Sequence, residues 1–255
     1  MSAHDPVFAR APVIAGEGHA ASAWRDSDWL QARPVRDARA WLATVAGLTV
    51  VAPHPDDETL GCGGLIADAR SLGIPVRVLS VTDGEACYAD DPDWPATRTR
   101  EVRRAELRTA LRALGVDDAA LVSLDMGDGR VDIHEARLTG LLTTLIQPDD
   151  VVLTTWRHDG HPDHEATARA ARRAAEMVGA RVFEYPVWAW HWVDPVSGDP
   201  RLDDAFACRI SAGALAAKHA ALGAFVSQRA RDGGAPILPP RVMARFERDI
   251  EVLLP

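Results

Sequence analysis

Short apolar runs alternate with longer stretches of helical spacing along the middle of the chain. Strands that alternate with helices are typical of βαβ units, so the pattern predicts an α/β fold with a mostly parallel sheet and helices on both faces. The predicted strands are residues 48–52, 76–82, 120–124, 151–155 and 182–187. The predicted helices are residues 59–72, 97–114, 132–146 and 163–178, the third opened by a capping box of Asp132 and Glu135.

The two ends of the chain follow this alternation less clearly. Residues 1–47 are rich in Ala, Arg and Asp, with one predicted helix at 37–45. Beyond residue 197 we expect a strand at 206–210 and a helix at 212–227. Because no repeat and no low-complexity linker interrupts the sequence, we expect one domain over residues 1–255. This domain divides into an N-terminal extension (1–47), a motif-bearing core (48–188) and a C-terminal part (189–255).

The tripeptide His-Pro-Asp occurs twice, and each copy directly follows a predicted buried strand. The copies lie in residues 54–58 (His-Pro-Asp-Asp-Glu) and 161–164 (His-Pro-Asp-His). Polar residues at 83–85 and 125–130 follow two further strands. Ligands of an open parallel sheet bind at the carboxyl ends of its strands. Imidazole and carboxylate without thiolate form the ligand set of a catalytic metal, so we expect a metal site at this edge.

The first motif offers both a metal ligand and a proton acceptor. His54 and one of the two adjacent acids, Asp56 and Asp57, can bind the metal, which leaves the other carboxylate free to take a proton from water. Pro55 makes the turn stiff. The alternative is that the acids, with Glu58, only interact with the positive end of the following helix.

The second motif supplies two further imidazoles. His161 and His164 are three residues apart, which places both rings on one side of a helical turn. His164 completes a set of two histidines and one aspartate with an open position, and His161 faces the substrate. Asp163 can orient a ligand imidazole through a hydrogen bond, cap the following helix, or do both. His158, in the same loop, is left outside the site.

Composition and charge exclude several classes of function. The formal net charge is -9, which argues against broad binding of nucleic acid or anionic membranes. The three cysteines, Cys62, Cys87 and Cys208, lack the spacing of a metal knuckle and suggest a reducing compartment. We find no signal peptide and no run of membrane-spanning length, and we expect a cytoplasmic protein.

These motifs resemble those of the PIG-L/LmbE family of zinc-dependent N-deacetylases. Its opening Ala-His-Pro-Asp-Asp-Glu signature corresponds to residues 53–58, where only Pro53 departs, and continues as Thr-Leu-Gly-Cys-Gly-Gly. Its Gly-His-Pro-Asp-His signature is present at 160–164. The similarity covers about residues 48–188 and includes segments 82–85, 103–107 and 113–116. The resemblance implies a Rossmann-like fold.

The resemblance also implies a ligand set and a mechanism. His54, Asp57 and His164 would bind one Zn²⁺ per chain, with Fe²⁺ as a possible replacement. Asp56 would be the general base that takes a proton from water. His161 would assist the transition state or the leaving group. The substrate would be a small amino-sugar conjugate that loses an N-acetyl or other N-acyl group.

Three further positions bear on substrate binding. By the resemblance, Arg103 would help to hold a sugar or a phosphate, and Asp128 lies where a substrate-contacting acid often sits. Some relatives place a tyrosine that supports the oxyanion at the position of Asp159. An ionised acid cannot donate that hydrogen bond, so the oxyanion would be stabilised by zinc, by His161 or from elsewhere.

Other interpretations of the sequence stay open. Trp188, Trp190 and Trp192 alternate, so they would share one face of an extended segment. That face can stack on a sugar ring, cover the core, or form a contact in a homo-oligomer. Instead of a deacetylase, the metal site can belong to a dinuclear phosphoesterase, or to a non-catalytic metal-binding member of the fold.

Overall fold

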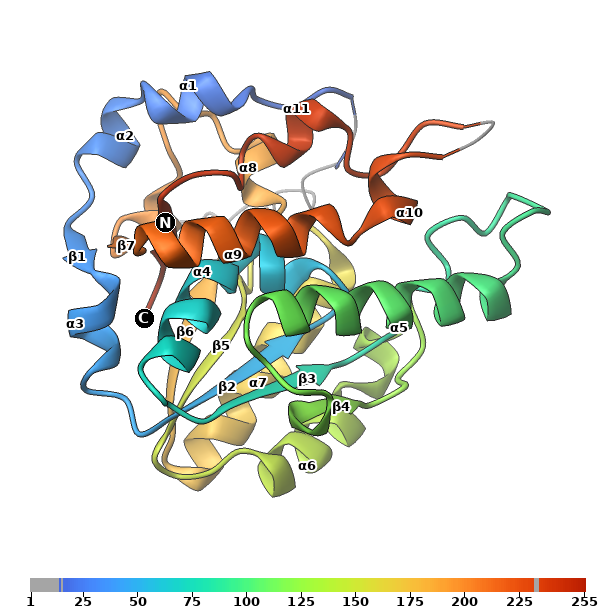
Figure 1. Ribbon diagram of the computed structural model, residues 1–255, viewed down its shortest axis with the longest axis horizontal. Coiled ribbons are helices and arrows are strands. Elements are labelled where there is room, and N and C mark those ends of the chain that lie inside the picture. Colours follow the sequence, from blue (N-terminus) through green and yellow to red (C-terminus); the bar gives the residue numbers. More distant parts are fainter. Residues whose placement is uncertain (1–13, 15, 232–233) are drawn as a thin grey trace, which may run out of the picture.

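The computed structural model describes residues 14, 16–231 and 234–255, and its centre is a parallel sheet (Figure 1). The strand order is β4-β3-β2-β5-β6, and every neighbouring pair in it is parallel. The predicted α/β class with a parallel sheet is therefore confirmed. The strands are β2 (Gly47–Ala52), β3 (Val76–Ser80), β4 (Leu121–Ser123), β5 (Asp150–Thr155) and β6 (Arg181–Tyr185).

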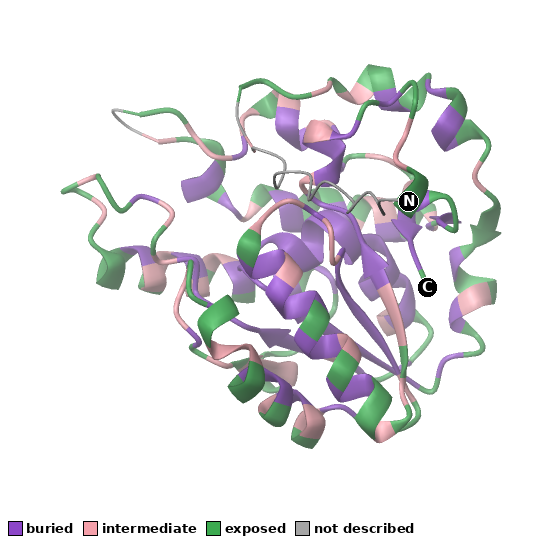
Figure 2. Ribbon diagram, turned by 180° about the vertical axis from the view of Figure 1, so that it is seen from behind, coloured by how far each residue is buried: buried purple, intermediate pink, exposed green. Residues whose placement is uncertain are grey.

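Side chains alternate between the two faces of the sheet along each strand, which divides the hydrophobic core into two layers. On β2, Val50 belongs to the cluster beneath α4 and α9, whereas Val51 belongs to the cluster beneath α6 and α7. Successive side chains of a strand point to opposite faces, so both layers are apolar. Figure 2 shows the buried strands and the exposed outer turns of the surrounding helices. The large helices are α4 (Asp57–Ser71), α5 (Ala96–Ala113), α6 (Glu135–Leu145), α7 (Pro162–Val178) and α9 (Ala212–Gly223).

A small second sheet joins the two ends of the described chain. Strand β1 (Val35–Asp37) pairs in parallel with β7 (Phe206–Arg209), which pairs antiparallel with β8 (Ile250–Leu253). Glu184 of β6 and Leu254 exchange two backbone hydrogen bonds of 2.8 Å, which attach this sheet to the edge of the main one. The strand predicted at 206–210 is confirmed. Whether residues 1–255 form one domain stays a prediction.

The remaining elements are short. The helix predicted at 37–45 is shorter, because β1 occupies its start, and the helix predicted at 212–227 ends at Gly223. The short helices are α1 (Ala21–Arg25), α2 (Asp28–Gln31), α3 (Ala38–Leu42), α8 (Ala189–Trp192), α10 (Val226–Arg229) and α11 (Pro240–Met243), with 3₁₀ turns at Asp118–Ala120, Asp132–His134 and Pro200–Leu202. Within the part of the chain described, no helix combines the length and the apolar character needed to cross a membrane.

Two local predictions are wrong. Asp132 does not form a capping box, because it lies in a 3₁₀ turn without a side-chain cap, and Glu135 instead pairs with Arg169 on α7. The tryptophan segment is not extended, because Trp190 and Trp192 lie in the helical turn α8. Trp190 is 3% exposed, and its ring centroid lies 4.8 Å from that of Trp24 in the N-terminal extension. This indole therefore packs in the core.

Helix α4 is broken one turn after its start. Cys62 has φ -144° and ψ 22°, so the hydrogen-bond ladder is interrupted there. The carboxylate of Glu251 accepts the N–H groups of Gly64 and Leu65 at 2.7 and 2.8 Å, while Lys218 donates to the carbonyl of Leu60 at 3.0 Å. These two charges supply partners that the broken helix would otherwise lack.

Lys218 and Glu251 also bind each other in a buried ion pair. The distance from Lys218 Nζ to Glu251 Oε1 is 2.6 Å, and both side chains are almost wholly buried. Two glycines let α4 approach its neighbours closely. A Cβ at Gly61 would overlap the ring of Tyr185, and one at Gly64 would overlap the side chain of Ile210. The break in α4 is thus a packed and hydrogen-bonded feature.

We expect Glu251→Ala to lower the free energy of unfolding by about 3–5 kcal/mol, because it leaves the Lys218 ammonium buried without its counter-charge. Urea unfolding measures this loss. The matched control is Asp249→Ala, two residues before Glu251. It breaks an exposed ion pair with Arg209 and should cost less than about 1 kcal/mol. Equal losses in the two variants would contradict this account of the broken helix.

Candidate metal centre and active site

The two His-Pro-Asp motifs meet at the carboxyl ends of the two central strands. His54 follows β2, and His164 lies in the first turn of α7. Helix α7 follows β5 in the chain, and Figure 1 labels β2, β5 and α7. Strands β2 and β5 are direct neighbours in the sheet, so the loops after them lie side by side. The predicted convergence of the two motifs at this edge is confirmed.

Three side-chain atoms form a nearly equilateral triangle at this edge. His54 Nδ1, Asp57 Oδ2 and His164 Nε2 are each 3.2 Å from the other two. Ligands of a tetrahedral zinc lie about 2.0–2.1 Å from the metal, which puts them about 3.3 Å from one another. The donor set and its spacing therefore fit a divalent cation. The assignment of these residues as ligands stays a prediction.

The electrostatics of the triangle favour positive charge. Burial opposes protonation of His164, but Asp57 and Asp159 outweigh it and raise the pKa of this imidazole to about 9. Burial alone would raise the pKa of Asp57, but His164 and His54 hold this pKa well below its usual range. The carboxylates thus create a negative potential at the imidazoles, which is a property that a cation site requires.

Asp159 fixes the tautomer of His164, a role that the sequence analysis missed. The carboxylate is fully buried and accepts a hydrogen bond from His164 Nδ1 at 2.8 Å, so in the neutral ring the lone pair of Nε2 points into the triangle. It also accepts the backbone N–H groups of Val187, Trp188 and Ala189 at 2.8–3.0 Å. These bonds explain why helix α8 begins here. The only signal in the sequence was an acid where some relatives have tyrosine.

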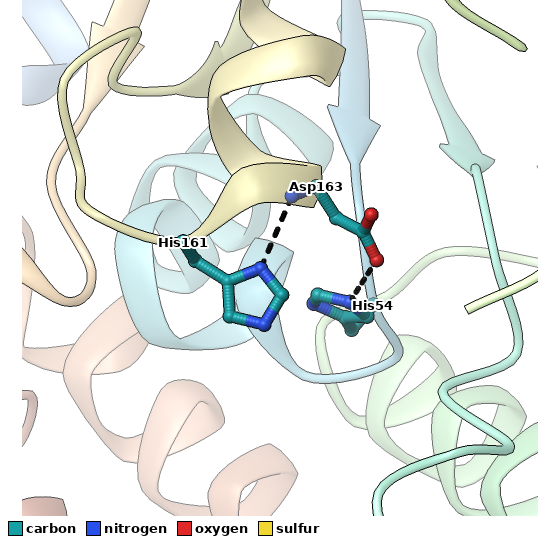
Figure 3. A group of neighbouring side chains, drawn as sticks. All are labelled: His54, His161 and Asp163. Atoms are coloured by element: carbon teal, nitrogen blue, oxygen red, sulfur yellow. Dashed lines mark hydrogen bonds and ion pairs between the residues drawn. The ribbon is translucent and has the colours of Figure 1, made fainter. Parts of the chain in front are cut away.

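Asp163 contacts the imidazole of the other motif (Figure 3). Its Oδ2 lies 3.2 Å from His54 Nε2, and Asp128 Oδ1 lies 3.1 Å from the same nitrogen. The backbone N–H groups of Gly129 and Val131 donate to the Asp163 carboxylate at 2.7 and 3.1 Å. Asp163 thus contacts the His54 ring through a carboxylate that is itself held in place, and its role in orienting a metal ligand stays a prediction. The other predicted role is wrong, because His161 is the N-cap of α7.

Asp56 occupies a strained backbone position beside the triangle. Its φ of 138° is unfavourable for any residue with a Cβ, and strain of this kind concentrates at functional sites. The Arg103 guanidinium donates to Asp56 Oδ2 at 2.9 Å, and Glu58 accepts the Asp56 N–H at 3.1 Å. Burial raises the pKa of Asp56 to about 7, although Arg103 acts in the opposite direction. These contacts hold the Asp56 carboxylate in one orientation.

His161 presents a neutral hydrogen-bond donor. Its Nδ1 accepts the backbone N–H of Asp163 at 3.2 Å (Figure 3), so the proton of the neutral ring lies on Nε2. Burial, together with the positive charges of His164 and His54, lowers the pKa of His161 to about 3. The ring therefore suits stabilisation of a developing negative charge better than it suits general acid catalysis.

These side chains open onto a cavity of about 370 Å³, a size typical of small-molecule sites. All the sequence-predicted site residues line it except His164 and Asp163, which are fully buried and contact His54. Arg103 is 3% exposed and donates to the carbonyls of Pro55 and Gly84 as well as to Asp56. Its contact with Asp56 was not predicted. The roles of Arg103 and Asp128 toward a substrate stay predictions.

The fold and the site define an α/β protein with a candidate metal centre at the carboxyl edge of its sheet. Residues 49–175 match the family model of PIG-L, described as GlcNAc-PI de-N-acetylase, and the chain belongs to this family. A conserved protein from Thermus thermophilus, TT1542, has a solved structure that is 30% identical. The match covers 70% of this chain and 79% of that one, with a TM-score of 0.50.

Two curated relatives carry named activities. A 1D-myo-inositol 2-acetamido-2-deoxy-alpha-D-glucopyranoside deacetylase from Mycobacterium sp. (strain JLS) is 33% identical over 64% of this chain and 58% of that protein. A probable N-acetyl-alpha-D-glucosaminyl L-malate deacetylase 2 from Bacillus cereus is 30% identical over 51% of this chain and 60% of that protein. The chain thus spans less than two thirds of the length of these relatives.

We expect Asp159→Asn to weaken metal binding by about 10–100-fold. An amide oxygen is a poorer acceptor for the His164 Nδ1–H group than a carboxylate, so the His164 ring is held less firmly in its orientation. Competition with a chromophoric chelator measures the dissociation constant for Zn²⁺. The control is Asp194→Asn, which changes an exposed acid that also accepts a backbone N–H. An unchanged constant in a folded Asp159→Asn protein would argue against this role.

Proposed function

We propose that the protein is a metal-dependent N-deacylase that removes an acetyl or other acyl group from a small amino-sugar conjugate, with one zinc ion per chain. The observation that carries the proposal is the 3.2 Å triangle of His54, Asp57 and His164 beside a strained, Arg103-bound Asp56. A metal-ligand set next to a separate carboxylate base is what metal-assisted hydrolysis needs.

The chain's own residues divide the chemistry among them. When bound, a divalent cation supplies a Lewis acid that polarises an acyl carbonyl and activates water. The carboxylate of Asp56 accepts the proton of the attacking water. The Nε2–H of His161 donates to the oxyanion that develops on the carbonyl oxygen. Arg103 holds Asp56 in place. The proton that Asp56 accepted passes to the amide nitrogen, the C–N bond breaks, and the free amine and the acyl acid leave.

The amino-sugar part of the proposal rests on the relatives. The two curated relatives are named for substrates that share an N-acetylated glucosamine and differ in the group attached to it, inositol or malate. For this chain we therefore propose the shared amino sugar and assign no attached group.

A dinuclear phosphoesterase is less well supported. A second group of residues that could hold a metal is His54, His161 and Asp163. This group shares His54 with the triangle, so two cations would have to be bridged by one imidazole ring. In two-metal sites that catalyse phosphoryl transfer, the two metals instead stabilise the attacking oxygen and the leaving oxygen together.

The proposed activity is tested by release of acetate from N-acetylglucosamine conjugates, with metal-stripped and zinc-restored protein side by side. We expect the rate of acetate release to fall at least about tenfold when the metal is removed and to return with zinc, because the metal activates the attacking water. Phosphate release from phosphomonoesters is measured in the same samples. Phosphate release without acetate release would favour the phosphoesterase.

We expect Asp56→Asn to keep its zinc and lose about 10²–10⁴-fold in kcat, because the amide cannot accept the proton. Asp57→Ala and His164→Ala should lose zinc as well. Metal content by mass spectrometry, measured with the rate, separates the two effects. The control is Asp125→Asn, an exposed acid at another positive φ (51°). Full activity in Asp56→Asn would exclude this residue as the base.

A further inference from the structure

The residues that line the cavity at the candidate site are of two kinds. The imidazoles and carboxylates, together with Arg103 and Gln228, are polar and are called the polar wall here. The apolar residues Leu60, Ile237, Leu238, Val242 and Phe246 are called the apolar wall. Four of these five side chains are buried, at 3–7% exposed, and belong to the main hydrophobic cluster. The apolar wall extends the core of the protein to the site.

The apolar wall begins directly beside the proposed ligands. Leu60 lies three residues after Asp57 on α4, so the two side chains share one face of the helix. Val187 also lines the cavity, and its backbone N–H binds the carboxylate that orients His164. Leu60 and Val187 therefore place aliphatic surface in the same cavity as the proposed ligands His54 and Asp57.

Backbone hydrogen bonds hold the apolar wall in place. The Leu238 N–H donates to the carbonyl of Gln228 at 2.8 Å, and the Phe246 N–H donates to that of Met243 at 2.9 Å. Arg245 also lines the cavity, but each of its three side-chain nitrogens is engaged, by the carbonyls of Glu17 and His19 and by the ring of His191. The wall is thus preformed, and its one cation is used to bind the N-terminal extension.

An aliphatic group is the ligand that suits this wall. Sugar hydroxyls would lose their hydrogen bonds to water there without replacement, which is costly. The polar wall offers such groups both donors and acceptors. The acyl chain is bonded directly to the carbonyl carbon that must lie at the metal, whereas an aglycone is separated from it by the sugar ring. Apolar surface that begins at the ligands therefore faces the acyl chain.

We propose that the wall formed by Leu60, Ile237, Leu238, Val242 and Phe246 binds the substrate's N-acyl chain, and that the preferred acyl group is an aliphatic chain longer than acetyl. This inference rests on the N-deacylase function proposed above and specifies its substrate class.

The first test uses the unaltered protein with zinc restored. Methyl glucosaminides carrying N-acetyl, N-butanoyl, N-hexanoyl and N-octanoyl groups are compared by the rate of release of the primary amine. We expect kcat/KM to rise by about three- to fourfold for each methylene group until the wall is filled. Fastest hydrolysis of the acetyl substrate would overturn the inference and leave the proposed function intact.

Two variants test whether the apolar wall causes the dependence of kcat/KM on acyl-chain length. Phe246→Ala removes part of the wall, and Val242→Phe fills the space in front of it. Each should lower the ratio of kcat/KM for hexanoyl over acetyl by roughly tenfold, because buried methylene contacts are lost. Met177→Ala, which changes an exposed side chain on α7 away from the cavity, should leave the ratio as it is. An unchanged ratio in both folded wall variants would overturn the assignment.

A third series separates the acyl chain from the aglycone. N-acetylglucosamine is presented as its methyl and octyl glycosides. A higher kcat/KM for the octyl than for the methyl glycoside, with the difference absent in Val242→Phe, would show that the wall binds an aglycone. That result would overturn the inference. Absence of amine release from every substrate, with zinc bound, would instead refute the proposed function.

Discussion

The buried pair of Lys218 and Glu251 is the interaction on which the geometry of the site depends. It allows α4 to break at Cys62 without leaving backbone groups unpaired. The break lets the first turn of the helix, which carries Asp57, take a direction of its own. The C-terminal part of the chain therefore holds the first metal motif in place, although it contributes no proposed ligand.

Buried carboxylates around the triangle are each matched by donors. Asp159 receives three backbone N–H groups and an imidazole, and Asp163 receives two backbone N–H groups and the other imidazole. Asp56 receives the Arg103 guanidinium. Burial of so many acids would be prohibitively unfavourable without such partners. Because each acid has a fixed partner, each can have a distinct role: ligand, orienting group or base.

Much of the fold and of the candidate site could be predicted because the signals are local. Strand and helix periods lie within about ten residues, and each His-Pro-Asp motif begins within six residues of the end of the strand that precedes it. The break in α4 and the apolar wall could not be predicted in this way. They depend on partners far apart in the chain, such as Gly64 and Glu251, which are 187 positions apart. Asp159 is only five positions from His164, but the backbone N–H groups that hold its carboxylate are 28–30 positions away. The tryptophan segment was misjudged for the same reason, because an acid in another loop starts the turn α8.

The broken helix also has a consequence for biosynthesis. A ribosome makes the chain from its N-terminus, so the three proposed ligands emerge well before Glu251 does. At that stage the N–H groups of Gly64 and Leu65 have no carboxylate to receive them, and the first turn of α4 is not yet held. The candidate metal centre thus reaches its final geometry only after β8 has been translated and has docked, long after its ligands have been made.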